Sequence, residues 1–261
     1  HPDDGSKKVT DSAASGTALA TGYKTYNGAI SVDHNKRPIK TIVEWAEEKN
    51  MKTGLVATST ITHATPACFG AHVDYRKKEG EIARQLAESE IDVLLGGGKD
   101  FWDDEIINIL EKNGGNYFSQ FESINQTEKR VVGLFSYGPL PKHNDNRNPT
   151  TTEMTKKALD LLDDSSNGIF LMVEESQVDW GGHSNNAEYI KSEMLSLNEV
   201  INFCLDYQKK NPEVLVVLTA DHECGGVAIH DGGDGNLSIK FTSDYHSAGF
   251  VPIWATGPGA D

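Results

Sequence analysis

The sequence contains few cysteines for its length, with three among 261 residues, at positions 68, 204 and 224, and no CxxC pair. An odd number without paired spacing provides no disulfide framework and no cysteine-type zinc site. Long hydrophobic runs are also missing. The longest, around Val214 to Leu218, is far shorter than the ~20 residues that span a bilayer, so no transmembrane helix is expected.

Basic residues are scarce as well, since 24 Lys and Arg face 39 Asp and Glu and leave a net charge of −15. This balance argues against a general nucleic-acid binder, which must neutralise backbone phosphates. An anionic substrate would need a local positive charge, which bound cations supply best. With 37% hydrophobic and 24% charged residues, the composition is that of a globular protein able to bury a substantial core.

Short apolar runs alternate with segments of helical spacing along the chain. The expected strands are residues 53–58, 91–95, 169–173 and 214–218, and the expected helices are residues 39–50, 81–89, 104–113, 150–163 and 187–210. This alternation predicts βαβ units and a largely parallel sheet covered on both faces. The stretch 113–148 has poor periodicity and is interpreted as an insertion or lid, and the glycine-rich residues 231–235 as a hairpin turn or, less simply, a calcium loop.

Chemically active side chains gather where the predicted strands end, which is where parallel sheets place their functional sites. They are Glu174, Asp179 and His183 after the third strand, Asp221 and His222 after the fourth, His63, Thr65 and Arg76 after the first, and His246 before a further strand-like run. Carboxylates and neutral imidazoles are the ligands of catalytic zinc, whereas Thr and Glu oxygens suit magnesium. Their convergence predicts a metal site.

Each residue also has a purely structural interpretation. Asp11 and Ser12 could cap a helix, and Thr65-Pro66 could start one. The Asp-x-x-x-His spacing is common at surfaces, and residues 221–223 could form a solvated turn. Ser12 lacks the GxSxG surroundings of a hydrolase triad. Activation by a metal at a helix N-terminus fits Ser12 better, with Arg76 as a bidentate clamp on phosphate oxygens.

Five segments, in this order, resemble the alkaline phosphatase family. They are residues 9–17 (VTDSAASGT) continued by 21–30, then 63–76, 173–183, 219–222 and 246–259. The resemblance covers nearly the whole chain. It implies an α/β fold, a three-layer α/β/α sandwich with a mostly parallel central sheet, formed by a single domain over residues 1–261.

The resemblance also implies two Zn²⁺ ions, one Mg²⁺ ion and a role for each site residue. Ser12 would be the nucleophile that becomes phosphoserine, and Arg76 would bind the phosphate. The implied metal ligands are Asp179, His183 and His246 for the first zinc, Asp221 and His222 for the second zinc, and Thr65 and Glu174 for magnesium. His63 and Trp180, where enterobacterial members commonly have Asp and Lys, would tune phosphate binding and the metal surroundings.

The activity implied by the resemblance is hydrolysis of small-molecule phosphate monoesters. Two alternatives stay open: a phosphodiesterase of the same superfamily, or a non-catalytic fragment that binds metal or phosphate. A sulfatase is disfavoured because no CxPxR-like motif is present. The family is commonly dimeric, and its members would place this chain in the periplasm or outside the cell.

One departure from the family concerns the amino-terminal side. The family carries a Gly-Asp-Gly motif well before the serine, and its aspartate is shared between the second zinc and magnesium. Eleven residues precede Ser12 here. We therefore expect a chain truncated at both ends, in which the second zinc and the magnesium lack one carboxylate.

Overall fold

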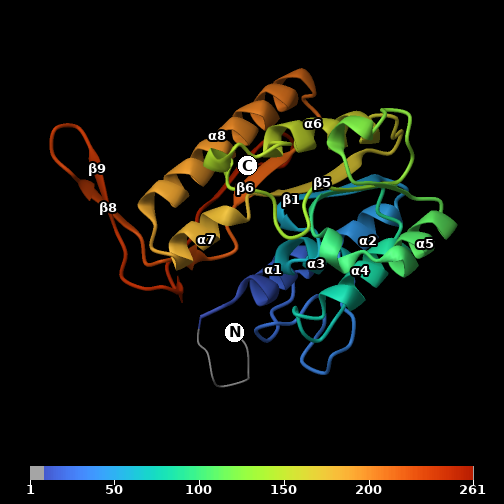
Figure 1. The fold of residues 1–261 in the computed structure, drawn as a ribbon, viewed down its shortest axis with the longest axis horizontal. Coiled ribbons are helices and arrows are strands. Elements are labelled where there is room, and N and C mark those ends of the chain that lie inside the picture. The colour runs from blue at the N-terminus through green and yellow to red at the C-terminus, as the bar shows by residue number, and fades with distance from the viewer. Residues whose placement is uncertain (1–8, 261) are drawn as a thin grey trace. The chain divides into compact units, whose positions relative to one another are not determined.

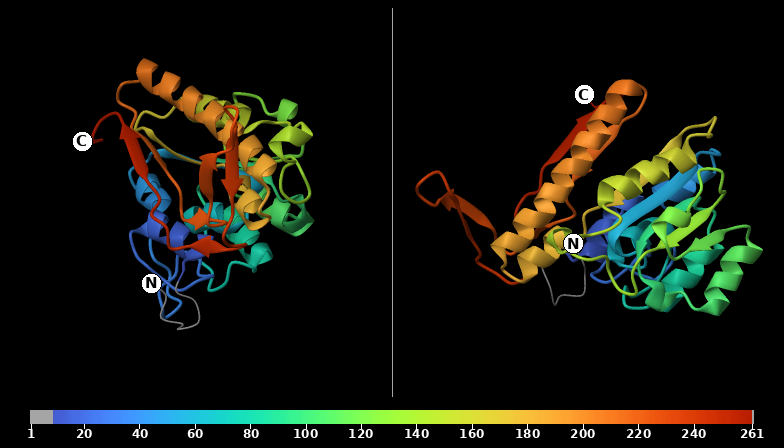
Figure 2. Two further views of the ribbon diagram at one scale, coloured as in Figure 1. Left: turned by 90° about the vertical axis from the view of Figure 1, so that its left-hand side faces the viewer. Right: turned by 45° about the horizontal axis from the view of Figure 1, so that its top comes forward.

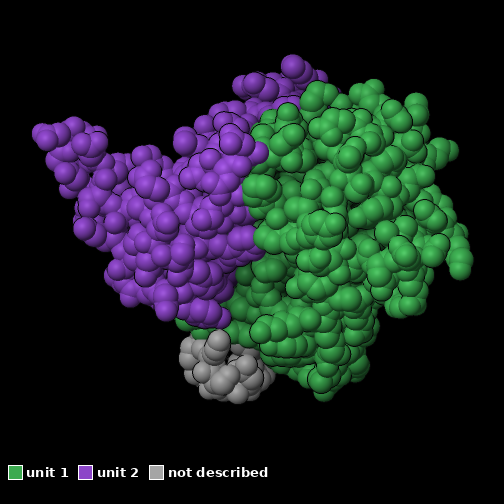
Figure 3. Space-filling view, viewed as in Figure 1, with its two compact units in different colours: residues 1–141, 147–176 green, residues 142–146, 177–261 purple. Residues whose placement is uncertain are grey.

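A computed structural model describes residues 9–260, and the chain divides into two compact units (Figure 3). Unit 1 comprises residues 1–141 and 147–176, and unit 2 comprises residues 142–146 and 177–261. The single domain expected over residues 1–261 stays a prediction. Each unit is described by itself below.

Unit 1 is built on a five-stranded sheet with the order β3-β4-β2-β1-β5 (Figure 1). Its strands are β1 (Lys52–Thr60), β2 (Val93–Gly97), β3 (Asn116–Phe118), β4 (Val131–Leu134) and β5 (Ile169–Glu174). Every neighbouring pair is parallel. The predicted α/β fold with a mostly parallel central sheet is therefore confirmed.

Helices cover both faces of this sheet (Figure 1). They are α1 (Ser12–Thr21), α2 (Ile42–Glu47), α3 (Ala64–Gly70), α4 (Glu79–Glu88), α5 (Asp104–Lys112) and α6 (Thr151–Leu162). Alternate β1 residues face opposite ways: Leu55 and Ala57 join the core under α1 and α3 to α5, whereas Val56 packs with residues of α6. This period of two is what a strand buried on both faces requires, and it gives unit 1 three layers.

The segment 113–148 is not the insertion or lid that its composition suggested. It supplies β3 and β4 to the sheet, and Val131, Val132 and Leu134 are buried in the core. The two strands are short, and β4 is interrupted by Gly133, where an added Cβ would lie 2.8 Å from Leu95. Strands this short, and interrupted by glycine, leave little periodic signal in the sequence.

The described residues of unit 2 include two α-helices, α7 (Gln177–His183) and α8 (Ala187–Lys210), and three antiparallel strand pairs. The pairs join β6 (Val216–Thr219) to β11 (Ile253–Thr256), β7 (Glu223–Cys224) to β10 (His246–Ser247), and β8 (Ala228–Asp231) to β9 (Leu237–Lys240). Strands β6 and β11 lie along α8 (Figure 2). The predicted strand around 214–218 is thus present but pairs antiparallel with β11.

The hairpin predicted at residues 231–235 is confirmed as the turn between β8 and β9. Positive φ angles at Gly233, Asp234 and Gly235 suit this glycine-rich turn. Across residues 9–260, no helix combines the length and the apolar character that crossing a membrane requires.

Candidate active site

Helix α1 of unit 1 begins at Ser12 because Asp11 caps it. The Asp11 backbone is extended, and its Oδ1 accepts hydrogen bonds from the backbone N–H groups of Ala14 (3.0 Å) and Gly28 (3.1 Å). Small residues let α1 approach α3 closely, since an added Cβ on Gly16 would lie 3.2 Å from Cys68 Sγ. Ser12 is thereby held, largely buried, in the first turn of the helix, where backbone N–H groups favour an anion.

Arg76 is held in place from two sides. Its Nη1 donates to Asp11 Oδ2 at 3.1 Å, and its Nη2 lies 3.2 Å from His63 Nε2, which must accept because a guanidinium only donates. His63 itself precedes α3 as its N-cap residue. Unit 1 therefore brings together Arg76, His63 and the residue that caps the helix of Ser12. The planar fork of the guanidinium suits a phosphate or carboxylate.

Thr65 and Glu174, the predicted magnesium ligands, also lie in unit 1. Thr65 stands in the first turn of α3, and its buried Oγ1 has no hydrogen-bond partner among residues 9–260. Glu174 ends β5, where its Oε2 accepts from Ser176 Oγ at 2.5 Å and Ser59 Oγ at 3.5 Å. A buried hydroxyl without a partner costs free energy, and a bound cation would relieve that cost. The oxygen chemistry of these side chains fits magnesium.

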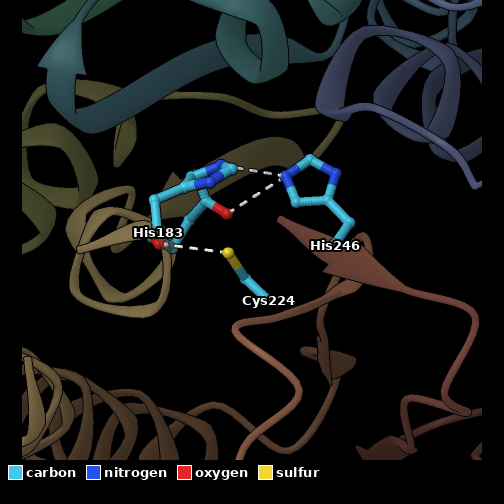
Figure 4. A group of neighbouring side chains, drawn as sticks. His183, Cys224 and His246 are labelled. Carbon is cyan, nitrogen blue, oxygen red and sulfur yellow. Dashed lines mark hydrogen bonds and ion pairs between the residues drawn. The ribbon is translucent and has the colours of Figure 1, made fainter. Parts of the chain in front are cut away.

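The residues predicted to hold the first zinc meet in unit 2 (Figure 4). Helix α7 presents Asp179 and His183 on one face, four positions apart, and β10 brings in His246. The Nε2 atoms of His183 and His246 are 3.1 Å apart, and the Asp179 carboxylate lies within 3.5 Å of both. The Sγ atom of Cys224 also belongs to this group, and the four ligand atoms, one from each residue, lie within 4.8 Å of one another.

The hydrogen bonds of His183 determine which of its nitrogens faces this group. Its Nδ1 lies 2.8 Å from the backbone carbonyl of Asp244, which can only accept. Nδ1 therefore carries a proton, and Nε2 is the nitrogen that faces His246 and Asp179. Lone pairs and a carboxylate that converge in this way repel one another unless a cation or an extra proton lies between them. This donor chemistry fits a catalytic zinc ion.

The Asp179 carboxyl is suited to hold a cation at neutral pH. Burial raises the pKa of this carboxyl, but the neighbouring His246 and Cys224 and the charges of His183 and His222 outweigh that effect and lower the pKa to about 2. The group is therefore an anion over the whole physiological range.

Asp221 and His222, predicted for the second zinc, lie beside the first group. Asp221 Oδ2 is 3.1 Å from His222 Nε2, and the His222 ring stacks on His246 with a centroid distance of 3.5 Å. Burial lowers the pKa of His222, but the hydrogen bond and the charge of Asp221 raise it by more, so the pKa lies above its usual value. Trp180 lies in α7, where its backbone carbonyl accepts from Ser184.

The place of Cys224 was not predicted, because Cys224 belongs to no CxxC pair. The available signal was that Cys224 follows His222 by two positions, and alternate residues of an extended chain share a face. Gly182 packs against it, since an added Cβ there would lie 2.9 Å from Cys224 Sγ. The ion pair between Asp11 and Arg76 was also missed, because 65 positions separate the two residues.

Comparison with known proteins identifies the family. The profile of the alkaline phosphatase family matches residues 1–260. Alkaline phosphatases 4 and 3 of Bacillus subtilis are 40% and 43% identical over 94% and 90% of this chain, which spans 57% and 53% of their lengths, or just over half. The solved alkaline phosphatase of the Antarctic bacterium TAB5 is 36% identical, with a TM-score of 0.92 over 98% of this chain and 80% of its own.

A variant of the TAB5 enzyme, with a histidine replaced by aspartate, was solved with Mg bound in its M3 site; its TM-score is 0.90 at the same identity and coverage. The residues matched by the family profile include both groups of side chains described above, the one around Ser12 and Arg76 and the one around Asp179. This chain belongs to the alkaline phosphatase family.

Proposed function

We propose that this chain hydrolyses phosphate monoesters of small molecules as a metal-dependent phosphomonoesterase, through a phosphoserine intermediate on Ser12. Family membership supports the class of reaction. The observation that carries the proposal is the convergence of two imidazole nitrogens 3.1 Å apart with the Asp179 carboxylate, because this donor set calls for a cation.

The residues for three ions follow from the donor chemistry and the family. Asp179, His183 and His246 would hold one Zn²⁺, Asp221 and His222 would contribute to a second, and Thr65 and Glu174 would contribute to Mg²⁺. Bound ions of this kind lower the pKa of a coordinated hydroxyl or water and balance charge on the phosphoryl group. The TAB5 variant with bound magnesium supports the assignment of that metal to the family.

The chain's own residues would carry out the two displacements. The Ser12 hydroxyl loses its proton as its oxygen forms a bond to phosphorus, the ester P–O bond breaks, and the leaving alkoxide takes up a proton to become the alcohol. Water then attacks the phosphoserine, which breaks the bond to Ser12 and releases inorganic phosphate. Arg76, held by Asp11 and His63, would bind two phosphate oxygens, and the first turn of α1 would favour their charge.

Two further properties are inferred from the family. We infer assembly as a homodimer and a location in the periplasm or outside the cell. Light scattering on the purified chain tests the first, and a monomer at micromolar concentration would overturn it. Fractionation of the cells that produce the protein tests the second.

The test of the function combines metal content with turnover. The chain is loaded with zinc and magnesium, its metals are counted by mass spectrometry, and p-nitrophenyl phosphate hydrolysis is measured on the same sample. Ser12→Ala should abolish turnover, while Ser15→Ala, three positions along the same helix, should leave it within about twofold. Substrate added at low pH should leave a phosphate on the Ser12 peptide. A metal-loaded chain without turnover, or an active Ser12→Ala variant, would overturn the proposal.

A further inference from the structure

We propose that Cys224 is a fourth donor to the metal ion held by Asp179, His183 and His246, which makes this a mixed carboxylate, imidazole and thiolate site. The inference rests on the proposed function, because it assumes that these three residues bind the ion. It concerns only residues of unit 2.

Strand pairing places Cys224 on the same face as His246. The two residues are direct partners in the antiparallel pair of β7 and β10, so their side chains project to the same side. The next pair, Glu223 and Ser247, is hydrogen-bonded side chain to side chain, as alternate residues on the opposite face should be. The thiol is therefore directed by the backbone toward the side on which the His246 ring lies (Figure 4).

Helix α7 approaches the same thiol from the other direction. The Cys224 Sγ lies 3.3 Å from the backbone carbonyl of Asp179 and donates to it. The approach is close because residue 182 is glycine, where an added Cβ would lie 2.9 Å from both Cβ and Sγ of Cys224. The sulfur thus lies between α7 and β10, and one donor atom from each of the four residues falls within 4.8 Å of the others.

The chemistry of the sulfur gives the site a defined preference. A thiolate is a soft ligand that selects zinc, cobalt or cadmium over magnesium, and it adds a second negative charge beside that of Asp179. On coordination the sulfur–metal bond forms and the thiol proton passes to solvent. Because zinc can expand to five-coordination, four protein donors still leave one position for a substrate oxygen.

Two measurements on the full chain test the inference. Iodoacetamide labelling is followed at each cysteine by mass spectrometry, with and without Zn²⁺. Zinc should slow labelling of Cys224 at least about tenfold, because the alkylating agent needs a free thiolate. Cys204, half-buried on α8 of the same unit, is the matched control, and zinc should leave its labelling rate unchanged. The second measurement replaces zinc with Co²⁺ and records the near-ultraviolet absorption.

A sulfur ligand gives a thiolate-to-cobalt charge-transfer band, which Cys224→Ser should remove and Cys204→Ser should retain. If zinc binds but Cys224 keeps its metal-free labelling rate and the cobalt band is absent, the inference is wrong and the proposed function is untouched. If the unmodified chain binds no zinc at all, the proposed metal site itself fails. Labelling needs no variant, so the test does not depend on whether Cys224→Ser folds.

Discussion

Asp11 and Arg76 form an ion pair, with Oδ2 of the carboxylate 3.1 Å from Nη1 of the guanidinium. The other oxygen of the same carboxylate caps the helix that starts at Ser12. One side chain therefore fixes both where the helix begins and where the arginine lies. Substitution can separate these two roles, because capping needs only an oxygen, whereas the ion pair needs a charge.

The stability of the fold should distinguish the two roles of Asp11. Asp11→Asn keeps an oxygen for the Ala14 and Gly28 N–H groups, so the free energy of unfolding should change by only a few tenths of a kcal/mol. Asp11→Ala removes the cap and leaves buried N–H groups unpaired, which should cost about 2 kcal/mol. Urea unfolding of both variants measures the difference. Equal losses in the two variants would contradict the capping role.

Phosphate binding should depend on the shape of Arg76 as well as its charge. Arg76→Lys keeps the positive charge but cannot reach Asp11, His63 and a phosphate with one planar fork. Inhibition by inorganic phosphate should therefore weaken about tenfold, provided that the proposed function holds. Arg84→Lys is the control, because Arg84 pairs with Glu105 at an exposed position. A similar loss in both variants would point to a general charge effect instead.

The pH dependence of stability should carry a contribution from Glu47, the last residue of α2. Burial raises the pKa of Glu47 from 4.5 to about 7, with further increases from Glu90, Glu44 and Asp92 against a hydrogen bond from Thr53. A raised carboxyl pKa in the folded state means that stability is lost as the pH rises from 4.5 through 7. The helix C-terminus also disfavours the anion.

As the pH rises from 5 to 8, the free energy of unfolding of Glu47→Gln should therefore increase relative to that of the unmodified protein. The expected increase is about 1 kcal/mol after allowance for the half-exposed carboxylate. Urea unfolding at the two pH values measures this change. Glu111→Gln, at an exposed position on α5, should show no such pH-dependent gain. An equal gain at both pH values would mean that ionisation of Glu47 is not its cause.

Glycine at position 182 should be required for the approach of α7 to β7. Gly182→Ala would place a Cβ 2.9 Å from three atoms of Cys224, and relief of that overlap should cost about 1–3 kcal/mol of stability. Gly80→Ala is the matched control, because no atom lies within 4 Å of its added Cβ and the residue belongs to α4. That substitution should stabilise the protein by about 0.5 kcal/mol. Thermal unfolding of the two variants should therefore shift in opposite directions.

Much of the fold was predictable because its long elements combine a clear period with a start signal. Helix α8 spans residues 187–210, as its spacing predicted, and Asn186 caps it because its side-chain oxygen accepts a hydrogen bond from the Tyr189 N–H. Strand β5 is a continuous apolar run that ends at Glu174. Strands β3 and β4 escaped prediction because three or four residues carry no reliable period. The pairing of β4 with β2, and of β3 with β4, depends on distant parts of the chain.

The residues of the candidate site were easier to predict than its contacts. The strand-end rule and the family pattern together located Asp179, His183 and His246, which the structure does bring together. Cys224 joins them only because a two-residue strand pairs with another across 22 positions of the chain. No local signal in the sequence encodes that register, since neither partner is long enough to show alternation.

The close approach of His183 and His246 joins points 63 residues apart in the chain. An ion that binds both rings must hold the ends of this loop together, and closure of a loop that long costs about 4 kcal/mol of chain entropy. Ion binding and ordering of residues 184–245 would then be one coupled event. By mass action, the ordered population of this segment would rise with the concentration of free zinc. Where zinc is scarce, proteases would cleave this segment first.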